Sequence, residues 1–433
     1  MTRRELLAGF LGALQTTGKR PPNIVLIISD DHGWRDYGFM GHAVVRTPNI
    51  DKLAAGGLTY TRGYVPASLC RPSLASIMTG LYPHQHGITG NDPPGNARSP
   101  ENRASMVKIF ERSKTIAGML GEKGYTSHQS GKWWEGECKC GGFTVCMTHG
   151  DVSKGGRHGD EGLKIGRQTM QPVFDFIDGA GKNPFFLWYA PFLPHTPHNP
   201  PERLLSKYRA EGRPLELAKY YAMIEWLDES VGQLRGHIDK RGLTNDTVIV
   251  YLADNGWVQL EGAHELYDTR AKMSPFDAGL RTPLLVSWPG RITPRREDKV
   301  LASSVDIAPT VLGAARVKPP ANLPGLDLTN LDAAGRRRST FGSLFVHTAI
   351  DVNNPVKNLK YRWMIRDYWK LIDPYQPNAA LPLWDGRPGT GWIKEPALYD
   401  LASDPGEQKN LASQRADLVA SMKRELDAWW RVG

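Results

Sequence analysis

The stretch Asn23–Asp31, with the sequence NIVLIISDD, decides the fold. Its apolar run does not alternate with polar residues, which predicts a strand buried on both faces, as in a parallel sheet. Three similar runs follow, each short, rich in β-branched or aromatic residues and bounded by Gly, Pro or Asp. They are Phe185–Ala190, Thr247–Ala253 and Pro283–Trp288.

Helical patterns separate these predicted strands. They cover Ile50–Ala55, Ser73–Met78, Lys114–Lys123, Ala218–Lys240 and Ser304–Ala314. Alternation of strands and helices predicts an α/β fold in which a large, mixed but mostly parallel sheet is sandwiched by helices. We assign residues 21–330 to this main domain.

The C-terminal part, residues 335–433, has a different pattern. Short and more polar strands are predicted at Leu344–Thr348, Tyr361–Arg366 and Trp369–Ile372, and a closing helix at Leu411–Val432. This pattern indicates a smaller α+β subdomain with an antiparallel sheet. Its boundary is expected near residues 318–340, where Pro, Gly and Asn concentrate.

The overall charge favours anionic partners. The chain of 433 residues has a formal net charge of +9 and a pI of about 9.2. A basic surface suits sulfate esters, phosphate esters or acidic polysaccharides. No dense Lys/Arg run with interleaved aromatic residues is present, which argues against nucleic acid, and no segment approaches the length of a membrane span.

The N-terminus resembles an export signal. Arg3 and Arg4 precede a short apolar run, Leu6–Leu14, and polar residues follow. This order is typical of exported proteins, and the paired arginines resemble a twin-arginine signal. We predict an export signal within residues 1–20 and a periplasmic or secreted protein; a plain N-terminal helix is the alternative.

Two predicted strands end in pairs of oxygen-bearing side chains. Asp30-Asp31 follows the first strand, and Asp254-Asn255 follows the strand Thr247–Ala253. Ligands of open α/β sheets bind at the carboxyl ends of strands. Carboxylate and amide oxygens suit Ca²⁺ or Mg²⁺. We predict one cation site from both pairs; the alternative is that each pair caps its own turn.

Cys70 stands apart from the other cysteines. It lies just before Pro72 and a helical stretch, so a helix is expected to begin at Pro72, with proline at its first position. Free backbone N–H groups and the helix dipole favour an anion, or a nucleophile of anionic character, at such a position. A buried loop cysteine is the alternative.

These residues, taken together, resemble the sulfatase family of the alkaline phosphatase superfamily. The motifs keep the family's order over nearly the whole chain. They are Asp30-Asp31, Thr47-Pro48-Asn49, Cys70-x-Pro72-Ser73, Thr79-Gly80-Leu81-Tyr82-Pro83, Gly131-Lys132-Trp133, Pro194-His195-x-Pro197, Asp254-Asn255-Gly256, Lys272 and Leu398-Tyr399-Asp400-Leu401.

The resemblance implies roles for several residues. Cys70 would be converted to formylglycine by a maturation enzyme and would join Asp30, Asp31, Asp254 and Asn255 at a Ca²⁺ ion, with Mg²⁺ as the alternative. Lys132 and Lys272 would hold sulfate oxygens. His195 would assist the leaving oxygen. The implied substrate is a sulfated carbohydrate or a small sulfate ester.

The sequence departs from the family at two positions. Leu74 stands where the cysteine signature has arginine, and Trp134 stands where histidine often follows Lys132. Arg71 would then supply the missing charge. The Gly-rich, charged insert 150–167 and its flank would contribute substrate-binding residues: His149, Arg157 and His158. A solvated loop is the alternative.

Three other cysteines, Cys138, Cys140 and Cys146, lie close together before His149. In an exported protein a disulfide within this group is the simpler interpretation, and a zinc site is the alternative. Two other functions stay open for the whole chain. They are a phosphoric or phosphonic ester hydrolase of the same fold, and an inactive binding protein that kept the pocket.

Overall fold

The computed structural model describes residues 20–432 apart from residues 155, 263–265, 379 and 381–392. The predicted export signal therefore lies outside the described residues, except for Arg20. Within the described part, no helix combines the length and the apolar character needed to cross a bilayer.

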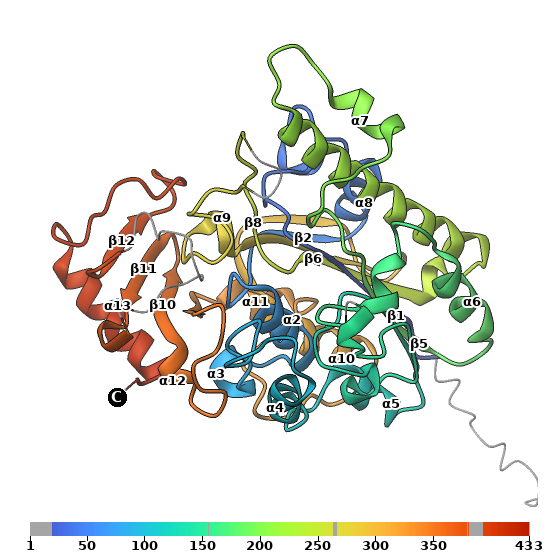
Figure 1. The fold of residues 1–433 in the computed structure, drawn as a ribbon, viewed down its shortest axis with the longest axis horizontal. Helices are drawn as coiled ribbons and strands as arrows, with labels where there is room; N and C mark the ends of the chain where they lie inside the picture. Colours follow the sequence, from blue (N-terminus) through green and yellow to red (C-terminus); the bar gives the residue numbers. More distant parts are fainter. Residues whose placement is uncertain (1–19, 155, 263–265, 379, 381–392, 433) are drawn as a thin grey trace, which may run out of the picture.

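An eight-stranded sheet forms the centre of the larger part, in the order β4-β3-β5-β1-β6-β7-β2-β8 (Figure 1). Its central strand β1 runs parallel to both of its neighbours, β5 and β6. The strands are β1 (Asn23–Ser29), β2 (Leu58–Tyr64), β3 (Thr126–Gly131), β4 (Val145–Cys146), β5 (Phe185–Ala190), β6 (Thr247–Ala253), β7 (Arg281–Ser287) and β8 (Arg295–Ser303).

Helices cover both faces of this sheet because β1 is apolar on both sides. Ile24, Leu26 and Ile28 face a core that includes residues of α2, α4, α5 and α10, whereas Val25 and Ile27 face α1, α6 and α8. These helices are α1 (Pro48–Ala55), α2 (Cys70–Thr79), α4 (Pro100–Phe110), α5 (Ile116–Gly121), α6 (Gln171–Gly179), α8 (Leu215–Lys240) and α10 (Ile307–Ala314).

The C-terminal part contains a four-stranded antiparallel sheet in the order β12-β11-β10-β9, with α13 packed on it. Figure 1 shows it beside the large sheet. The elements are β9 (Ser339–Phe345), β10 (Leu359–Arg366), β11 (Trp369–Pro374), β12 (Ala397–Asp400) and α13 (Ala416–Trp429). The remaining short helices are α3 (Pro83–His86), α7 (Glu202–Tyr208), α9 (Asp277–Leu280), α11 (Leu331–Arg336) and α12 (Pro355–Asn358).

A buried ion-pair cluster joins the two sheets. Lys370 on β11 is fully buried, and its Nζ lies 2.9 Å from Asp277 Oδ1 and 2.8 Å from Glu407 Oε1. Asp277 begins α9, and its backbone N–H donates to Glu407 Oε2 at 2.7 Å. The charge of Lys370 therefore ties the C-terminal sheet to the loop that also carries Lys272.

The predicted fold class is confirmed: the sheet is mixed and mostly parallel, helices cover both faces, and a smaller antiparallel sheet follows. Two details differ. The run Pro283–Trp288 lies in β7, which is antiparallel to β6 because the chain between them returns to the sheet at the carboxyl end of β6. The helix expected to begin at Pro72 begins at Cys70, since a proline third in a helix lacks only an N–H that has no helical partner.

Candidate active site

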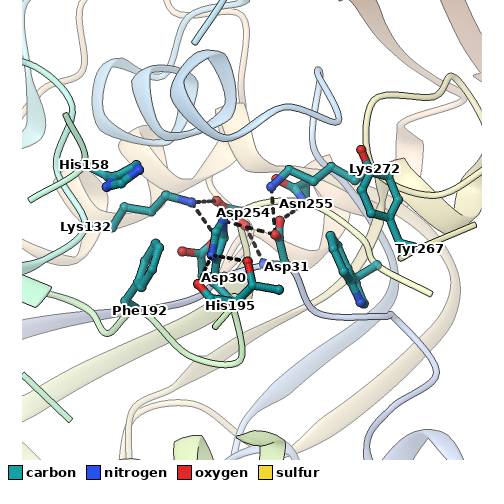
Figure 2. A network of polar contacts seen from close by, with 12 residues as sticks. Asp30, Asp31, Lys132, His158, Phe192, His195, Asp254, Asn255, Tyr267 and Lys272 are labelled. Carbon is teal, nitrogen blue, oxygen red and sulfur yellow. Dashed lines mark hydrogen bonds and ion pairs between the residues drawn. The ribbon is translucent and has the colours of Figure 1, made fainter. Parts of the chain in front are cut away.

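The two acidic pairs meet at the carboxyl edge of the sheet. β1 and β6 pair in register from Asn23 opposite Thr247 to Ser29 opposite Ala253, so both pairs leave the sheet side by side. The backbone N–H of Asp31 donates to Asp254 Oδ1 at 3.1 Å, and Asn255 Nδ2 donates to Asp31 Oδ1 at 2.7 Å. The predicted convergence of Asp30, Asp31, Asp254 and Asn255 is therefore present (Figure 2).

Two buried lysines pair with the carboxylates of this cluster. Lys132 Nζ lies 2.5 Å from Asp30 Oδ1 and 3.2 Å from Asp254 Oδ2. Lys272 Nζ lies 2.7 Å from Asp31 Oδ2. These carboxylates raise the pKa of both lysines above the ordinary value against the opposing effect of burial, so both ammonium groups stay charged.

Lys132 is held at the end of β3 by a glycine that no other residue could replace without a backbone shift. Gly131 has a φ of +84°, and a Cβ there would lie 1.9 Å from the carbonyl oxygen of Ala190. The Lys132 N–H donates to that same carbonyl at 2.7 Å. The close approach of β3 to the end of β5 therefore fixes the lysine beside Asp30.

Cys70 is the first residue of α2 and is buried beside the acidic pair. A ligand atom from each of Asp30, Asp31, Cys70 and His195 lies within 4.8 Å of the other three. Burial raises the pKa of the Cys70 thiol to about 11, against the effect of Lys132 and Lys272. An unmodified thiol would thus stay protonated at neutral pH.

His195 follows β5 and faces the cluster. Its Nε2 lies 3.3 Å from Asp31 Oδ2, and its Nδ1 lies 2.7 Å from the carbonyl oxygen of Thr196. A carbonyl can only accept, so Nδ1 carries the proton and Nε2 is the nitrogen that faces the site. Burial lowers the pKa of His195 to about 3, although Asp31 opposes this shift.

The carboxyl groups of the cluster differ in pKa because their surroundings differ. Burial alone would raise the pKa of Asp31, but Lys272 and His195 together lower it below the ordinary value. Burial and the neighbouring Asp30 raise the pKa of Asp254 to about 7. The cluster carries more carboxylate than its two lysines balance, which suits an added cation.

The donor set fits a divalent cation that prefers oxygen. Within the described residues, Asp30 Oδ2 and Asn255 Oδ1 are buried and accept no hydrogen bond. Unpartnered buried oxygens are rare and need a compensating partner. Oxygens of this type, grouped with the Asp31 and Asp254 carboxylates, are the ligands that Ca²⁺ and Mg²⁺ take.

The four predicted substrate-binding residues are placed differently. Arg71 is fully buried and pairs with Glu135 at 2.8 Å and 2.5 Å, so its charge is used inside the protein. His149 is exposed, and its backbone N–H donates to Asp160. Arg157 pairs with Asp92 at 2.8 Å and 2.6 Å. Of the four, His158 is the one that Figure 2 places beside Lys132.

The two departures from the family pattern are both packed in the core. Leu74 and Trp134 belong to the apolar cluster on the α2 side of the sheet. Arg71 does not take over the position of a residue at the cation site, because its guanidinium faces Glu135 instead. Sequence reasoning missed Glu135 as this partner, and it missed Phe192, whose ring lies 4.2 Å from that of His195.

The cysteine group contains a disulfide between Cys138 and Cys146, with Cα atoms 6.0 Å apart. Cys140 is free and half-buried. The disulfide interpretation therefore agrees with the structure, and it removes two of the ligands that the alternative zinc site needs.

Comparison with known proteins identifies the class. The Sulfatase family model matches residues 22–317, and a model described as N-sulphoglucosamine sulphohydrolase, C-terminal, matches residues 262–389. Human arylsulfatase A is 30% identical, with 94% of this chain and 86% of that protein aligned. Rat N-acetylgalactosamine-6-sulfatase is 30% identical, with 73% of this chain and 67% of that protein aligned. The chain belongs to the sulfatase family, and it is a sulfatase enzyme.

Solved structures confirm the fold. A protein whose structure was solved in complex with its substrate D-glucosamine-2-N,6-O-disulfate superposes with a TM-score of 0.72 at 19% identity, over 94% of this chain and 98% of that one. The phosphonate monoester hydrolase of Agrobacterium radiobacter superposes with a TM-score of 0.69 at 19% identity, over 94% and 95%. Proteins with different ester substrates therefore share this fold.

Proposed function

We propose that this sulfatase removes sulfate from a sulfated carbohydrate or a small sulfate ester, using a formylglycine made from Cys70 and a bound Ca²⁺. The observation that carries the proposal is the cluster of buried Asp30, Asp31 and Cys70 with half-buried His195, which has two lysines at its edge. Mg²⁺ is the alternative cation. An oxygen-rich donor set is compatible with both.

A cation held by Asp30, Asp31, Asp254 and Asn255 would make the proton of the oxidised, hydrated side chain at residue 70 easier to lose, and that side chain would supply the nucleophile. Residues of the chain itself bind the sulfate group and handle the proton of the leaving oxygen. Lys132 and Lys272 stand on opposite sides of the acidic pair and bind the non-bridging sulfate oxygens as negative charge develops on them. Because both are charged and buried, their attraction for the oxygens is little screened by water.

His195 is the group that handles the proton of the leaving oxygen. Its Nδ1–H donates to the Thr196 carbonyl, so Nε2, which lies 3.3 Å from Asp31 Oδ2, is the nitrogen that faces the site. A neutral imidazole held in one tautomer can take up a proton and return it to the departing alcohol. Phe192 stacks on the ring and keeps it in this orientation.

Several features support a carbohydrate as substrate. The aligned N-acetylgalactosamine-6-sulfatase is named for a sugar sulfate, and the superposed structure at TM-score 0.72 holds a sulfated glucosamine. The net charge of +9 favours an anionic substrate.

We also propose that a maturation enzyme modifies Cys70. Residues 21–330 form the catalytic domain and residues 335–433 a smaller subdomain in this proposal, and the protein is periplasmic or secreted.

The direct test measures Cys70 and the reaction together. Mass spectrometry of the tryptic peptide that carries Cys70 should detect the aldehyde in protein produced with a maturation enzyme. Hydrolysis of an aryl sulfate should exceed that of the matching aryl phosphate, and a chelator should stop it. A thiol at position 70 in an active preparation would refute the formylglycine step.

The same assay separates the other functions. Faster cleavage of an aryl phosphate or phosphonate would favour the ester hydrolase represented by the superposed phosphonate monoester hydrolase. Leu74 keeps this alternative open, since the family's cysteine signature has arginine at that position. Cleavage of neither ester, with sulfated polymers also tested, would favour a binding protein.

A further inference from the structure

His158 packs near the same aromatic ring, that of Phe192, as His195 and Lys132 at the cation site. The ring of Phe192 lies 5.5 Å from the ring of His158, 4.2 Å from the ring of His195 and 5.8 Å from Lys132 Nζ. Figure 2 shows His158 and Phe192 on either side of the Lys132 side chain. The imidazole of His158 therefore lies next to the position where Lys132 would hold a sulfate oxygen.

The backbone around His158 is fixed on three sides. The Trp133 N–H donates to the His158 carbonyl at 3.1 Å, and Arg103 Nη2 donates to the Arg157 carbonyl at 3.0 Å. Thr148 Oγ1 donates to the Gly159 carbonyl at 2.9 Å. This segment of the insert is thus part of the rigid frame and not a freely moving loop.

Arg157 selects the tautomer of His158. Arg157 Nη1 lies 3.1 Å from His158 Nε2, and an arginine can only donate, so Nε2 accepts and Nδ1 carries the proton. Asp92 binds the other side of the same guanidinium at 2.8 Å and 2.6 Å, and the ring of Trp134 stacks against it at 4.9 Å. Asp92 and Arg157 therefore hold the His158 imidazole in one tautomer, with the proton on Nδ1.

In the part of the chain that the structure describes, the proton-bearing nitrogen of His158 has no hydrogen-bond acceptor. Among the described residues, none accepts a hydrogen bond from His158 Nδ1, which is buried from solvent. Burial and the adjacent Arg157 lower the pKa of His158 to about 2, so the ring stays neutral at every pH at which the enzyme would work. A buried donor without an acceptor is costly unless a ligand completes it.

We infer that His158 Nδ1–H donates a hydrogen bond to an oxygen of the bound sulfate group, as a further substrate-contacting residue, with Arg157 and Asp92 as positioning residues. This inference rests on the proposed function, because it assumes that the sulfate lies against Lys132. His158 differs from His195 in its task. It exchanges no proton, and it stabilises charge as a fixed neutral donor.

The variants His158→Ala and His158→Asn test the donor. Alanine removes it, and kcat/KM for an aryl sulfate should fall about 100-fold, the effect expected for one donor to a developing oxyanion. Asparagine places an amide N–H near the former Nδ1 and should keep kcat/KM within about tenfold of the wild-type value. The control His237→Ala removes a histidine of α8 that pairs with Asp178 of α6, and its kcat/KM should not change.

The kcat/KM of the His158→Ala variant decides the outcome of the activity measurement. A loss of less than about threefold, or an equal loss in the asparagine variant, would overturn the inference. A measurement on the wild-type protein covers the case in which alanine prevents folding. In cation-loaded, ¹⁵N-histidine-labelled protein, His158 should show the Nδ1–H tautomer, and inorganic sulfate should move its Nδ1 resonance. An unchanged resonance at saturating sulfate would also overturn it.

The activity measurement and the NMR measurement together distinguish a failure of this inference from a failure of the proposed function. A shifted Nδ1 resonance without hydrolysis of any sulfate ester would retain the sulfate contact and refute the hydrolase. Hydrolysis with an unshifted resonance would retain the hydrolase and refute the contact.

Discussion

The strongest test of the site is the replacement of Lys132 by methionine, which keeps the length of the side chain and removes its charge. Lys132 is 1% exposed, and its Nζ lies 2.5 Å from Asp30 and 3.2 Å from Asp254. A unit charge about 4 Å from a sulfate oxygen contributes about 4 kcal/mol at an effective dielectric constant of about 20. Lys132→Met should therefore lower kcat for an aryl sulfate by about 10³-fold.

The same variant should not lose its cation. Lys132 competes with a cation for the oxygens of Asp30 and Asp254, so its removal leaves these carboxylates with more charge to offer. Elemental analysis after dialysis should find metal content equal to or above that of the wild type. The combination of lost turnover and retained metal distinguishes a sulfate-binding lysine from one that only supports the fold.

A matched control makes the comparison quantitative. Lys207→Met removes a lysine from α7 that pairs with Glu225 at 2.6 Å, outside the cluster. It should keep wild-type kcat. If Lys132→Met loses less than tenfold in kcat while the metal is present, Lys132 does not contact the sulfate, and the assignment of the sulfate position is refuted.

The remaining predictions concern the cation and the stability of the fold. Asp254→Ala should lower cation affinity by at least about 100-fold, as elemental analysis after dialysis will measure, because it removes a buried carboxylate from the ligand set; unchanged metal content would contradict the site. Asp228→Ala should lower the free energy of unfolding in urea by about 2 kcal/mol, since Asp228 on α8 accepts from the backbone N–H groups of Asn49 and Ile50 at the start of α1. Burial lowers the pKa of His86 to about 3 from 6.5, so its neutral form stabilises the fold above pH 6.5, and this contribution is lost as the pH falls from 6.5 toward 3. Between pH 7.5 and pH 5 the loss is about 2 kcal/mol, and His86→Asn, which keeps an acceptor for the Ile88 N–H, should lose correspondingly less; an equal loss in both proteins would contradict this origin.

Much of the fold could be predicted because its central strands are uniform. β1, β5 and β6 have the bounds expected from their apolar runs, since a strand buried on both faces has almost no polar residue to blur its ends. β3 was missed because its sequence, TSHQSG, is polar although most of it is buried. Its side chains are satisfied by partners far along the chain, such as the Ser130 hydroxyl that donates to Trp188, and no local pattern reveals this.

The site was partly predictable for the same reason. Acidic pairs at the ends of two strands are visible in sequence, and their meeting follows from the parallel pairing of β1 with β6. The fate of Arg71 was not visible, since its partner Glu135 lies 64 positions further along the chain. Nor could sequence distinguish His158 from His149, because the difference lies in which of two nearby rings turns toward Phe192.

The buried charge of Lys370 has a consequence for how this enzyme can be modified. If the chain were truncated before β11, Lys370 and Glu407 would both be removed, and Asp277 would lose a counter-charge that is sealed from water, a change that typically costs about 3–5 kcal/mol. Asp277 stands five positions after Lys272, so the damage would reach the loop that carries this lysine of the candidate site. A chimaera that exchanges C-terminal segments between relatives should therefore transplant the lysine together with both of its acidic partners.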